Sequence, residues 1–233
     1  MCDSLVGVVL ELDLSSRGRG GKAGILRNED LVRPPRLILA SGSPRRRQLL
    51  EQLGLAFEVR PSDVDERLLA GEGPAEAAER LARAKAEHRA DAGSLALGCD
   101  TLVAHGEAVL GKPDSAREAA AMLERLSGEE HTVHTGIALA SPGRVESAVE
   151  ATRVWFRQLS ASECAEYAAT GEPLDKAGAY GIQGFGAAIV DRIEGDYFNV
   201  MGLPIRSLLQ LLEAFGWRYA FGTLQPIGIG EER

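Results

Sequence analysis

From Leu37 onward, short apolar runs alternate with stretches in which apolar residues recur every three or four positions. Side chains repeat every second residue along a strand and every 3.6 residues around a helix, so the runs predict strands and the stretches predict helices. The first strand is LILA at 37–40, and Leu49, Leu50 and Leu53 fall on one face of the helix that follows. Further strands are expected at 57–61, 95–105, 108–111, 131–141 and 145–160, and further helices at 74–90, 116–128, 161–171 and 205–215.

Residues that commonly begin helices stand at the expected starts of three of these stretches. Pro44 occupies a first helical turn, where its missing N–H group is no loss. Ser115 with Glu118, and Ser160 with Glu163, have the spacing of a capping box, in which each side chain bonds the other residue's backbone N–H. Strands that alternate with helices in this way predict a mixed α/β fold.

The two ends of the chain lack this periodicity. Residues 15–24 read SSRGRGGKAG, and LVRPPR at 31–36 contains two prolines that disfavour a helix. We interpret residues 1–35 as a basic, disordered extension, either a genuine tail or the product of a start site placed too far upstream. A nucleic-acid-binding arm is less favoured, because the segment has no aromatic residue to stack on bases. The folded domain is then 36–217, followed by a C-terminal tail at 218–233.

Charge and composition narrow the class of partner. The 233 residues carry 26 Lys and Arg against 34 Asp and Glu, and the excess of acids lies after residue 47, which disfavours binding to a nucleic-acid polymer. No apolar run reaches the roughly 18 residues needed to span a bilayer, and the first residues lack the positive start of a secretory signal. Three cysteines without a CxxC pair predict neither a disulfide framework nor a thiolate zinc site, so we expect a cytoplasmic protein without a membrane partner.

The segment SGSPRR at 41–46 joins the first strand to the first helix and combines features of a phosphate site. A helix N-terminus offers unpaired N–H groups and partial positive charge. Ser41 and Ser43 add hydroxyl donors, and Arg45 and Arg46 add guanidinium groups that can grip phosphate oxygens in pairs. Two arginines in a first turn oppose the helix dipole unless an anion offsets them. The alternative is that Ser43 only caps the helix and the arginines are solvated.

Acidic residues are candidates for proton transfer and metal binding. Asp100 lies within the apolar run LALGCDTLVA, where a carboxylate is costly unless it is paired or binds a metal. We therefore take Asp100 as a candidate general base and, with Glu66, as a candidate anchor for Mg²⁺, which favours carboxylates together with substrate phosphates. For the neighbouring Asp63 we favour a solvated turn, and for Asp65 that interpretation stays open.

Lysines in three segments could complete a polyanion site. Each of Lys85, Lys112 and Lys176 could instead be a surface charge, but together with the two arginines they would be enough to neutralise a triphosphate. The sequence around GKP is no Walker A loop, because the GxxxxGK[ST] spacing is absent, and GIQGFG fails the dinucleotide fingerprint. His131 and His134 lie on an expected strand, where positions three apart face opposite sides, so a zinc site there is disfavoured.

Six segments, taken in order, resemble a known family. They are LASGSPRRRQLL, SDVDE, RLARAKA, LGCDTLV, VLGKPDSAREAAAMLERLSGEEHTVHTGIAL and DKAGAYGIQGFGAAIVDRIEGDYFNVMGLP. Over about Leu37 to Gly216 the chain resembles the Maf family of nucleoside triphosphate pyrophosphatases. The resemblance implies a mixed twisted sheet with flanking helices, in two lobes around a deep cleft like that of the inosine triphosphate pyrophosphatases. It implies hydrolysis of a nucleoside triphosphate to the monophosphate and pyrophosphate, a divalent cation (Mg²⁺ or Mn²⁺) and a homodimer.

The resemblance also assigns roles to residues of this chain. The family's proton acceptor corresponds to Asp100, which would deprotonate the water that attacks the α-phosphorus. Its phosphate-binding motif corresponds to Ser41, Arg45 and Arg46. Its other polar cleft residues correspond to Glu66, Lys85 and Lys112.

The segment DKAGAYGIQG is similar to the branch of the family that acts on dTTP and UTP, in a possible house-cleaning role. Base selectivity there corresponds to Arg45, Thr101 and Gln183. The amide of Gln183 can donate to a ring carbonyl of a pyrimidine and accept from the adjacent ring N–H. A pyrophosphatase for 7-methyl-GTP or another modified nucleotide is an alternative. So is a non-catalytic regulator of cell division that senses nucleotides, although a sensor would have no need for Asp100.

Overall fold

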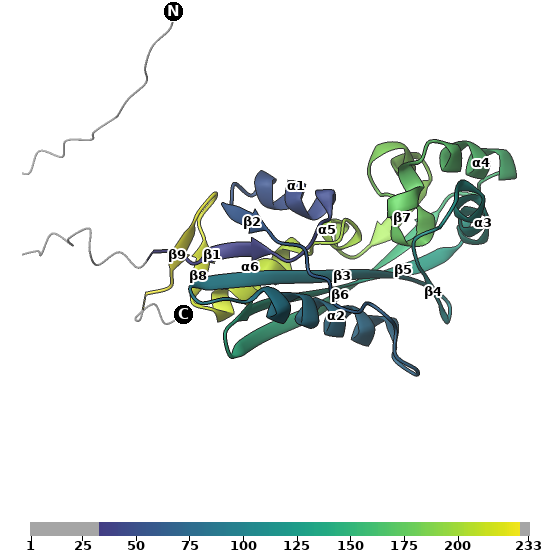
Figure 1. Cartoon of the computed structure of the whole chain (residues 1–233). Coiled ribbons are helices and arrows are strands. Elements are labelled where there is room, and N and C mark those ends of the chain that lie inside the picture. Colours follow the sequence, from purple (N-terminus) through teal and green to yellow (C-terminus); the bar gives the residue numbers. More distant parts are fainter. Residues whose placement is uncertain (1–32, 229–233) are drawn as a thin grey trace, which may run out of the picture. The chain divides into compact units, whose positions relative to one another are not determined.

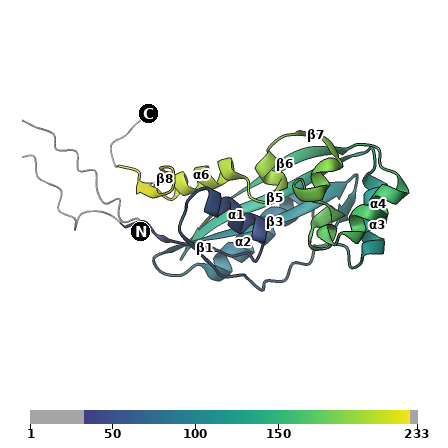
Figure 2. The same ribbon diagram turned by 90° about the horizontal axis from the view of Figure 1, so that it is seen from above.

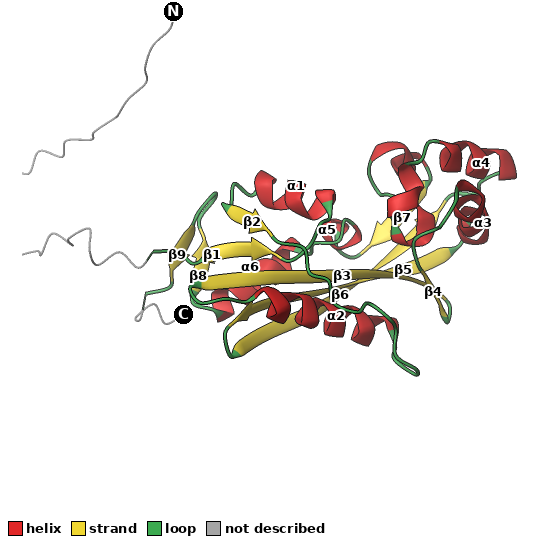
Figure 3. Ribbon diagram, viewed as in Figure 1, coloured by secondary structure: helices red, strands yellow, loops and turns green. Residues whose placement is uncertain are grey.

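The computed structural model describes residues 33–228 of the chain. Within that range seven strands form one sheet in the order β2-β1-β3-β5-β6-β7, with β4 paired to β3 outside that path (Figures 1 and 3). Their bounds are β1 Arg36–Leu39, β2 Phe57–Val59, β3 Ser94–His105, β4 Ala108–Leu110, β5 Glu130–Ser141, β6 Arg144–Phe156 and β7 Val190–Glu194. β1 runs parallel to β2 and β3, and the other pairings are antiparallel. The predicted mixed sheet is thereby confirmed.

Helices flank this sheet on both faces. The helix bounds are α1 Pro44–Gln52, α2 Pro74–Arg89, α3 Ala116–Leu126, α4 Ala161–Ala169, α5 Tyr197–Val200 and α6 Ile205–Ala214. α1 and α2 lie on opposite sides of β3 (Figure 1). Between α4 and β7 the chain forms three short 3₁₀ turns, η1 Glu172–Asp175, η2 Ala177–Ala179 and η3 Gly184–Ala188. No helix among the described residues is both long enough and apolar enough to cross a membrane.

The buried side chains form two main clusters along the long strands β3, β5 and β6. One cluster joins α1 and α6 to the first half of β3, through residues such as Leu50 and Leu97. The other joins α3 and α4 to the second half of β3, through residues such as Val103 and Leu123. Figure 2 shows α3 and α4 packed together at the end of the strands away from α6. Both clusters lie against the same continuous sheet.

β1 is much shorter than β3, and this difference opens the sheet beside Asp100. Leu39, the last residue of β1, lies beside Leu97 of β3. Beyond that point β3 keeps β5 on one side but has lost β1 on the other. Successive side chains of a strand point to opposite faces, so Asp100 points toward α2 and Thr101 toward α1. The open edge therefore lets groups from both faces of the sheet line one cavity.

Glycines bring α2 very close to the sheet. A Cβ atom on Gly98 would lie 2.1 Å from the carbonyl oxygen of Ala82 in α2, and one on Gly136 would lie 2.0 Å from another carbonyl oxygen of that helix. No other residue type fits at these separations. Gly136 is the register partner of Asp100 in β5. The close contact therefore carries Lys85 of α2 to the carboxylate of Asp100.

The predicted helix starts are found, with one difference. α1 begins at the predicted proline, and Ser160 and Glu163 form the reciprocal capping box of α4. The box predicted for α3 is only half formed, because Glu118 accepts from the N–H of Asp114 and not from that of Ser115. The backbone explains the difference, since Ser115 has a φ of −156° where Ser160 has −80°. This rotation turns the Ser115 N–H away from the helix.

The structure describes little of the predicted N-terminal extension but most of the predicted C-terminal tail. The expected extension at 1–35 lies outside the described residues, apart from 33–35, which belong to no helix or strand. The expected tail at 218–233 is wrong over its first part, because β8 Trp217–Tyr219 and β9 Leu224–Pro226 form a hairpin. Leu224 is buried in the cluster with α1 and α6, and the Tyr219 hydroxyl donates to the carbonyl of Leu53. The folded domain therefore continues to Pro226.

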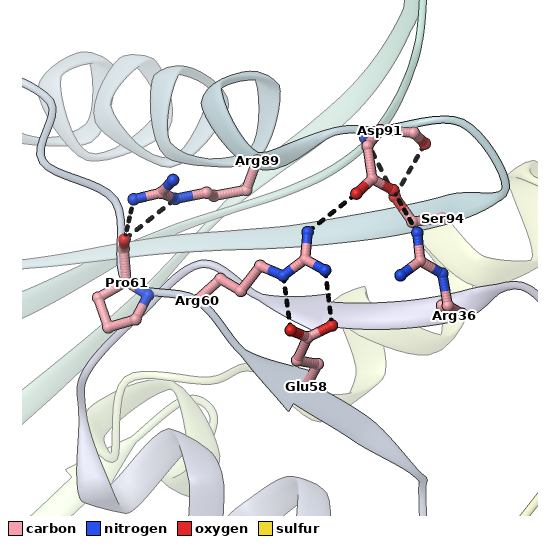
Figure 4. Close-up of polar contacts among 7 residues, drawn as sticks. All are labelled: Arg36, Glu58, Arg60, Pro61, Arg89, Asp91 and Ser94. Carbon is pink, nitrogen blue, oxygen red and sulfur yellow. Dashed lines mark hydrogen bonds and ion pairs between the residues drawn. The ribbon is translucent and has the colours of Figure 1, made fainter.

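A network of arginines and acids holds the edge strand β2 and the segment after it (Figure 4). Arg60 donates to both carboxylate oxygens of Glu58 and to Asp91 in the loop before β3. Arg89 of α2 donates to the carbonyl of Pro61. Such exposed pairs contribute little stability individually. Their effect is to fix the segment that leads from β2 into the cavity.

Candidate active site

A cavity of about 610 Å³ lies beside the second half of β3, where β1 has ended. Residues of both hydrophobic clusters contribute to its wall, including Val103 and Met201. It brings together every residue that the sequence suggested for the site, namely Ser41, Ser43, Arg45, Arg46, Glu66, Lys85, Asp100, Thr101, Lys112, Lys176 and Gln183. Segments far apart in the chain therefore converge on one hollow.

Asp100, Lys85 and Glu66 form a compact charged group on the α2 side of β3. The Nζ atom of Lys85 lies 2.6 Å from Oδ1 of Asp100 and 2.6 Å from Oε1 of Glu66. Asp100 is only 7% exposed, and Lys85 is equally buried. A buried carboxylate of this kind needs a cationic partner, and the lysine supplies one. Glu66, by contrast, is mostly exposed and reaches the group from the cavity mouth.

Cys99 precedes Asp100 but does not share its chemistry. The alternation of side chains along β3 places Cys99 in the core cluster on the other face. Burial raises the pKa of the Cys99 thiol to about 11. The thiol therefore stays protonated near neutral pH and offers no nucleophile.

Two carboxylates that meet at one ammonium group are also suited to a hard metal ion. Within residues 33–228 no group of three or more His, Cys, Asp and Glu side chains gathers around a common point. Three carboxylates line the cavity. Asp175 pairs with Arg45 and Lys176, whereas Glu66 and Asp100 meet at Lys85 and form the candidate pair for a metal ion. Mg²⁺ and similar ions are often held by one or two carboxylates, with phosphate oxygens and waters completing the shell. The donor set therefore fits such an ion once a phosphorylated ligand is present.

The turn from Ser41 to Arg46 is built as expected, but Arg46 is used mainly by the protein. Ser43 caps α1 by accepting from the N–H of Arg46. The Arg46 guanidinium donates to the carbonyl of Gly202 at 2.8 Å, to Ser41 Oγ at 2.9 Å and to Thr101 Oγ1 at 3.0 Å. Of the five N–H donors of an arginine, these bonds leave two for a ligand. Arg46 therefore joins three segments of the cavity wall, and its guanidinium group still lines the cavity.

Arg45, which precedes Arg46 in α1, also lines the cavity and lies near Asp175. Its Nη1 atom is 3.7 Å from Oδ2 of Asp175, just after Leu174 in η1. Burial lowers the pKa of Arg45, against the opposing effect of the Asp175 charge. An arginine nevertheless keeps its charge at neutral pH. Asp175, which the sequence did not single out as a site residue, is thus the counter-ion of the Arg45 side chain.

The remaining polar residues of the cavity differ in how they are held. Lys176 donates to the carbonyl of Glu172 and to Asp175 at 2.6 Å, so its ammonium group is already engaged. Within the described part of the chain, the Lys112 ammonium group and the Gln183 amide make no hydrogen bond or ion pair with the protein. Polar groups that line a cavity without a protein partner are the ones available to a ligand.

A buried network of hydroxyl and amide groups holds Thr101, and no sequence pattern indicated it. The Asn199 side-chain NH₂ donates to the carbonyl of Val133 and to the Thr152 hydroxyl, and the Asn199 backbone carbonyl accepts from the Thr135 hydroxyl at 3.0 Å. Since the Thr135 proton is used in this way, Thr101 donates to Thr135 across 3.0 Å. The Thr101 hydroxyl can therefore accept from a ligand but not donate to one. These residues come from four separate segments, β3, β5, β6 and α5, which is why no local motif connected them.

Much of the remaining wall is uncharged and mostly apolar. It includes Val103, Leu110, Val133 and Tyr180. The Tyr180 hydroxyl bonds Nε2 of His131 at 2.8 Å, and burial lowers the pKa of His131 to about 4. The histidine is therefore neutral and belongs to the core. The cavity thus offers both apolar surface suited to a flat ring and a set of charged groups.

Comparison with known families gives a match over most of the folded domain. Residues 36–215 match the family described as Maf-like protein. The matched range begins at β1 and ends just after α6. It therefore includes all the residues that line the cavity.

Several proteins that share one name are similar to this chain over most of their length. The dTTP/UTP pyrophosphatase of Moorella thermoacetica is 53% identical over 186 residues, covering 78% of this chain and 95% of that protein. Proteins of the same name from Geobacillus sp. and Vibrio cholerae are 50% and 48% identical over 183 residues, each covering 98% of the relative and 78% and 77% of this chain.

Among solved structures, the chain is similar to a HAM1 protein from Coxiella burnetii. That likeness has a TM-score of 0.46 at 19% identity and covers 78% of this chain and 98% of the other. The Ham1 protein of Staphylococcus aureus matches with a TM-score of 0.43 at 17% identity, over 77% of this chain and 97% of that one.

Proposed function

Because the chain belongs to the Maf-like protein family, we propose that it hydrolyses dTTP and UTP to the nucleoside monophosphate and pyrophosphate. The observation that carries this proposal is the single cavity, in which a buried aspartate and a set of cations stand beside an apolar wall. A nucleotide has the complementary parts, an anionic tail and a flat base. Relatives named dTTP/UTP pyrophosphatase support the choice of base.

In the proposed reaction Asp100 activates water. The Lys85 ammonium group bonds Oδ1 of Asp100, and the second carboxylate oxygen accepts a proton from the attacking water. The water oxygen forms a bond to the α-phosphorus, and the bond from that phosphorus to the α–β bridging oxygen breaks. The electron pair leaves with pyrophosphate. Lys112 and Arg46 stabilise the charge that develops on the leaving group.

A divalent cation, Mg²⁺ or Mn²⁺, belongs to this proposal. Glu66 and Asp100 would hold it together with phosphate oxygens, and its positive charge would lower the barrier by neutralising the phosphates. The oxygen-only character of these two side chains supports the choice of ion. Lys85 keeps the two carboxylates close to each other before a ligand arrives.

Base recognition is proposed for the side of the cavity that carries Gln183 and Thr101. The unengaged Gln183 amide can donate to a ring carbonyl of thymine or uracil and accept from the neighbouring ring N–H. Thr101 can only accept, which also suits a ring N–H. Arg45 lies near enough to contribute at the same side. Apolar residues such as Val103 would contact the faces of the ring.

The test is a screen for products with the purified full chain, Mg²⁺ or Mn²⁺, and dTTP, UTP, dCTP, GTP and 7-methyl-GTP. We expect pyrophosphate in equal amount to the monophosphate, with kcat/KM highest for dTTP and UTP. In ¹⁸O-labelled water the label should enter the monophosphate, since the attack is on the α-phosphorus. A preference for 7-methyl-GTP would replace the proposed substrate. Binding of dTTP without any product would favour a nucleotide sensor.

We further propose a cytoplasmic homodimer that binds nucleotides and no nucleic-acid polymer. The buried free thiols of Cys99 and Cys164 support a reducing compartment. Leu174 and Phe185 are exposed apolar side chains, which supports contact with a second copy. Light scattering tests the dimer, and an assay for binding to labelled DNA and RNA tests the expected absence of polymer binding.

A further inference from the structure

Glu172, at the start of η1, closes the segment that carries Gln183 into a loop. Its Oε2 atom accepts a hydrogen bond from the N–H of Phe185 at 2.9 Å, and its Oε1 atom accepts one from Gly186 at 3.0 Å. Oε1 also accepts from the Tyr167 hydroxyl at 2.8 Å. These bonds join positions 13 and 14 residues apart in the chain. The carboxylate therefore fixes the backbone on the C-terminal side of Gln183.

Tyr167, on α4, fixes the backbone on the other side of Gln183. The N–H of Gly181 donates to the Tyr167 hydroxyl oxygen at 3.2 Å, while that hydroxyl donates to Glu172. Burial and the bond to Glu172 raise the pKa of Tyr167, so the hydroxyl keeps its proton. Burial would raise the pKa of Glu172, but the hydrogen bonds that it accepts outweigh this effect and lower it. Tyr167 is thus protonated and able to donate, and Glu172 is ionised and able to accept, as these hydrogen bonds require.

Two glycines allow the loop to close around the carboxylate. Gly184 has a φ of +67°, and a Cβ atom there would lie 2.5 Å from Oε2 of Glu172. A Cβ atom on Gly186 would lie 2.1 Å from the carbonyl oxygen of Gly181. A side chain at Gly186 would require the backbone to move, and one at Gly184 would displace the Glu172 carboxylate that closes the loop. The loop therefore has one tightly defined path past Gln183.

We propose that Glu172 and Tyr167 are positioning residues that set the preference for the nucleotide base through Gln183. This inference rests on the proposed function, since it concerns the base that the same cavity accepts. Neither residue lines the cavity, so neither touches the nucleotide. Each acts by holding the backbone on one side of Gln183.

The physical reason is that the Gln183 side chain is not held by the protein itself. Its amide has no hydrogen-bond partner within residues 33–228, so the position of the amide follows the backbone. Paired hydrogen bonds to a ring carbonyl and a ring N–H need both groups in place, and a displacement of about 1 Å is enough to weaken such contacts. Loosening the loop should therefore reduce base preference more than it reduces the chemistry.

The experiment compares kcat and KM for UTP and CTP in three single variants of the full chain. Glu172→Gln keeps the size of the side chain but presents an NH₂ group to backbone N–H donors. Tyr167→Phe removes the hydroxyl alone and leaves the charge of Glu172 intact. Glu166→Gln is the matched control, because it changes an exposed acid on α4 that bonds only Ser162.

The expected result is a change in preference that acts through KM. Glu172→Gln should lower the ratio of kcat/KM for UTP over CTP about tenfold, the effect of losing one well-placed hydrogen bond, and Tyr167→Phe should lower it less. The kcat values should stay within about twofold, since the charged group at Asp100 is untouched. Glu166→Gln should leave both constants at the wild-type values.

A double-mutant cycle separates positioning from a general loss of structure. In a Gln183→Ala background, Glu172→Gln should change the UTP to CTP ratio no further, because the group that reads the base is absent. The proposal is overturned if Glu172→Gln lowers kcat/KM equally for both nucleotides, or if its effect on the ratio persists in the Gln183→Ala background.

Amide hydrogen exchange of the full chain without nucleotide gives a second readout that needs no activity. The N–H groups of Phe185 and Gly186 should exchange faster in Glu172→Gln than in wild type or Glu166→Gln. Unchanged exchange would contradict the proposed role. If wild type released pyrophosphate from no nucleotide, the proposed function would fail. In that case amide hydrogen exchange would still test whether Glu172 holds the loop. Calorimetry of UTP and CTP binding to the same variants would test whether the loop sets base preference.

Discussion

The two ends of the cavity are held in different ways. At the charged end, Asp100 and Lys85 stand on β3 and α2, whose separation is fixed by backbone contact at Gly98 and Gly136. At the other end, Gln183 stands in a segment of short 3₁₀ turns that is closed by side-chain-to-backbone hydrogen bonds. The charged end therefore depends on the packing of whole elements, and the other end on a few polar contacts.

This difference matches the chemistry proposed for each end. Every nucleotide carries the same triphosphate, so the groups that act on it gain from a rigid frame. The base is what varies between nucleotides. Substitutions in a loop can change which base the loop binds without disturbing the sheet. Substitutions at the charged end should lower kcat for all nucleotides alike, whereas substitutions around Gln183 should change the preference among them.

The largest effect is expected from Asp100→Asn. The variant keeps the shape of the side chain and its position beside Lys85 but cannot accept the proton of water. We expect kcat to fall by about 10²–10⁴-fold for dTTP and UTP alike, the usual contribution of a general base. Pyrophosphate release under saturating nucleotide measures it. Turnover at the wild-type rate would remove Asp100 from the mechanism.

Lys112→Ala should have the next largest effect. The Lys112 ammonium group has no partner among residues 33–228, whereas Lys176 is held by Asp175 and the Glu172 carbonyl. Loss of a donor to developing charge costs about 2–4 kcal/mol in the barrier, so kcat should fall by about 30- to 900-fold. Lys176→Ala is the comparison, and we expect it to raise KM more than it lowers kcat. Equal losses of kcat in Lys112→Ala and Lys176→Ala would contradict the proposal that Lys112, and not Lys176, stabilises the leaving group.

Gly98→Ala tests the rigid frame itself. The added Cβ atom would meet the Ala82 carbonyl oxygen at 2.1 Å and the Ala86 nitrogen at 2.6 Å, so α2 must move away from β3. We expect a loss of stability at or above the upper end of the about 1–3 kcal/mol usual for overpacking, measured by urea unfolding. Because Lys85 moves with the helix, kcat should also fall for all nucleotides.

The matched control for Gly98→Ala is Leu139→Ala, on the face of the sheet away from α2. Leu139 is fully buried among α1 and α6, and its truncation costs about 2–5 kcal/mol through a cavity. Assayed at a temperature where both variants are folded, Leu139→Ala should retain kcat and Gly98→Ala should not. A matching loss in both would mean that stability alone, and not the placement of Lys85, explains the effect.

The sequence predicted the charged end of the cavity better than the other end. Asp100 was found because a carboxylate in an apolar run is costly, and the Ser41–Arg46 turn because cations at a helix start are unusual. The helices and long strands that carry them followed from hydrophobic periodicity. The resemblance to a family then joined these segments into one site, which single patterns could not do.

What the sequence did not reveal depends on distant contacts. The role of Glu172 arises only when η3 folds back onto it, and that of Asn199 only when β5 and β6 lie beside it. Both residues stand in four-residue elements, η1 and α5, which are too short to show a hydrophobic period, so nothing local distinguishes them. The hairpin formed by β8 and β9 was missed for the same reason, since three-residue strands carry too little pattern.

The smallest expected effect concerns the acid stability of α4, the helix that carries Tyr167. Hydrogen bonds from the Ser160 backbone, from Arg157 and from the Ser160 hydroxyl lower the pKa of Glu163 from 4.5 to about 2. A carboxylate with a lowered pKa in the folded state stabilises it fully above the unfolded value, and this contribution is lost as the pH falls toward 2. The difference in unfolding free energy between wild type and Glu163→Gln should therefore be constant above about pH 5.5 and shrink between pH 4.5 and 2. Urea unfolding across this range measures it, and a difference that stays constant down to pH 2 would show that the capping carboxylate does not stabilise α4 through its charge.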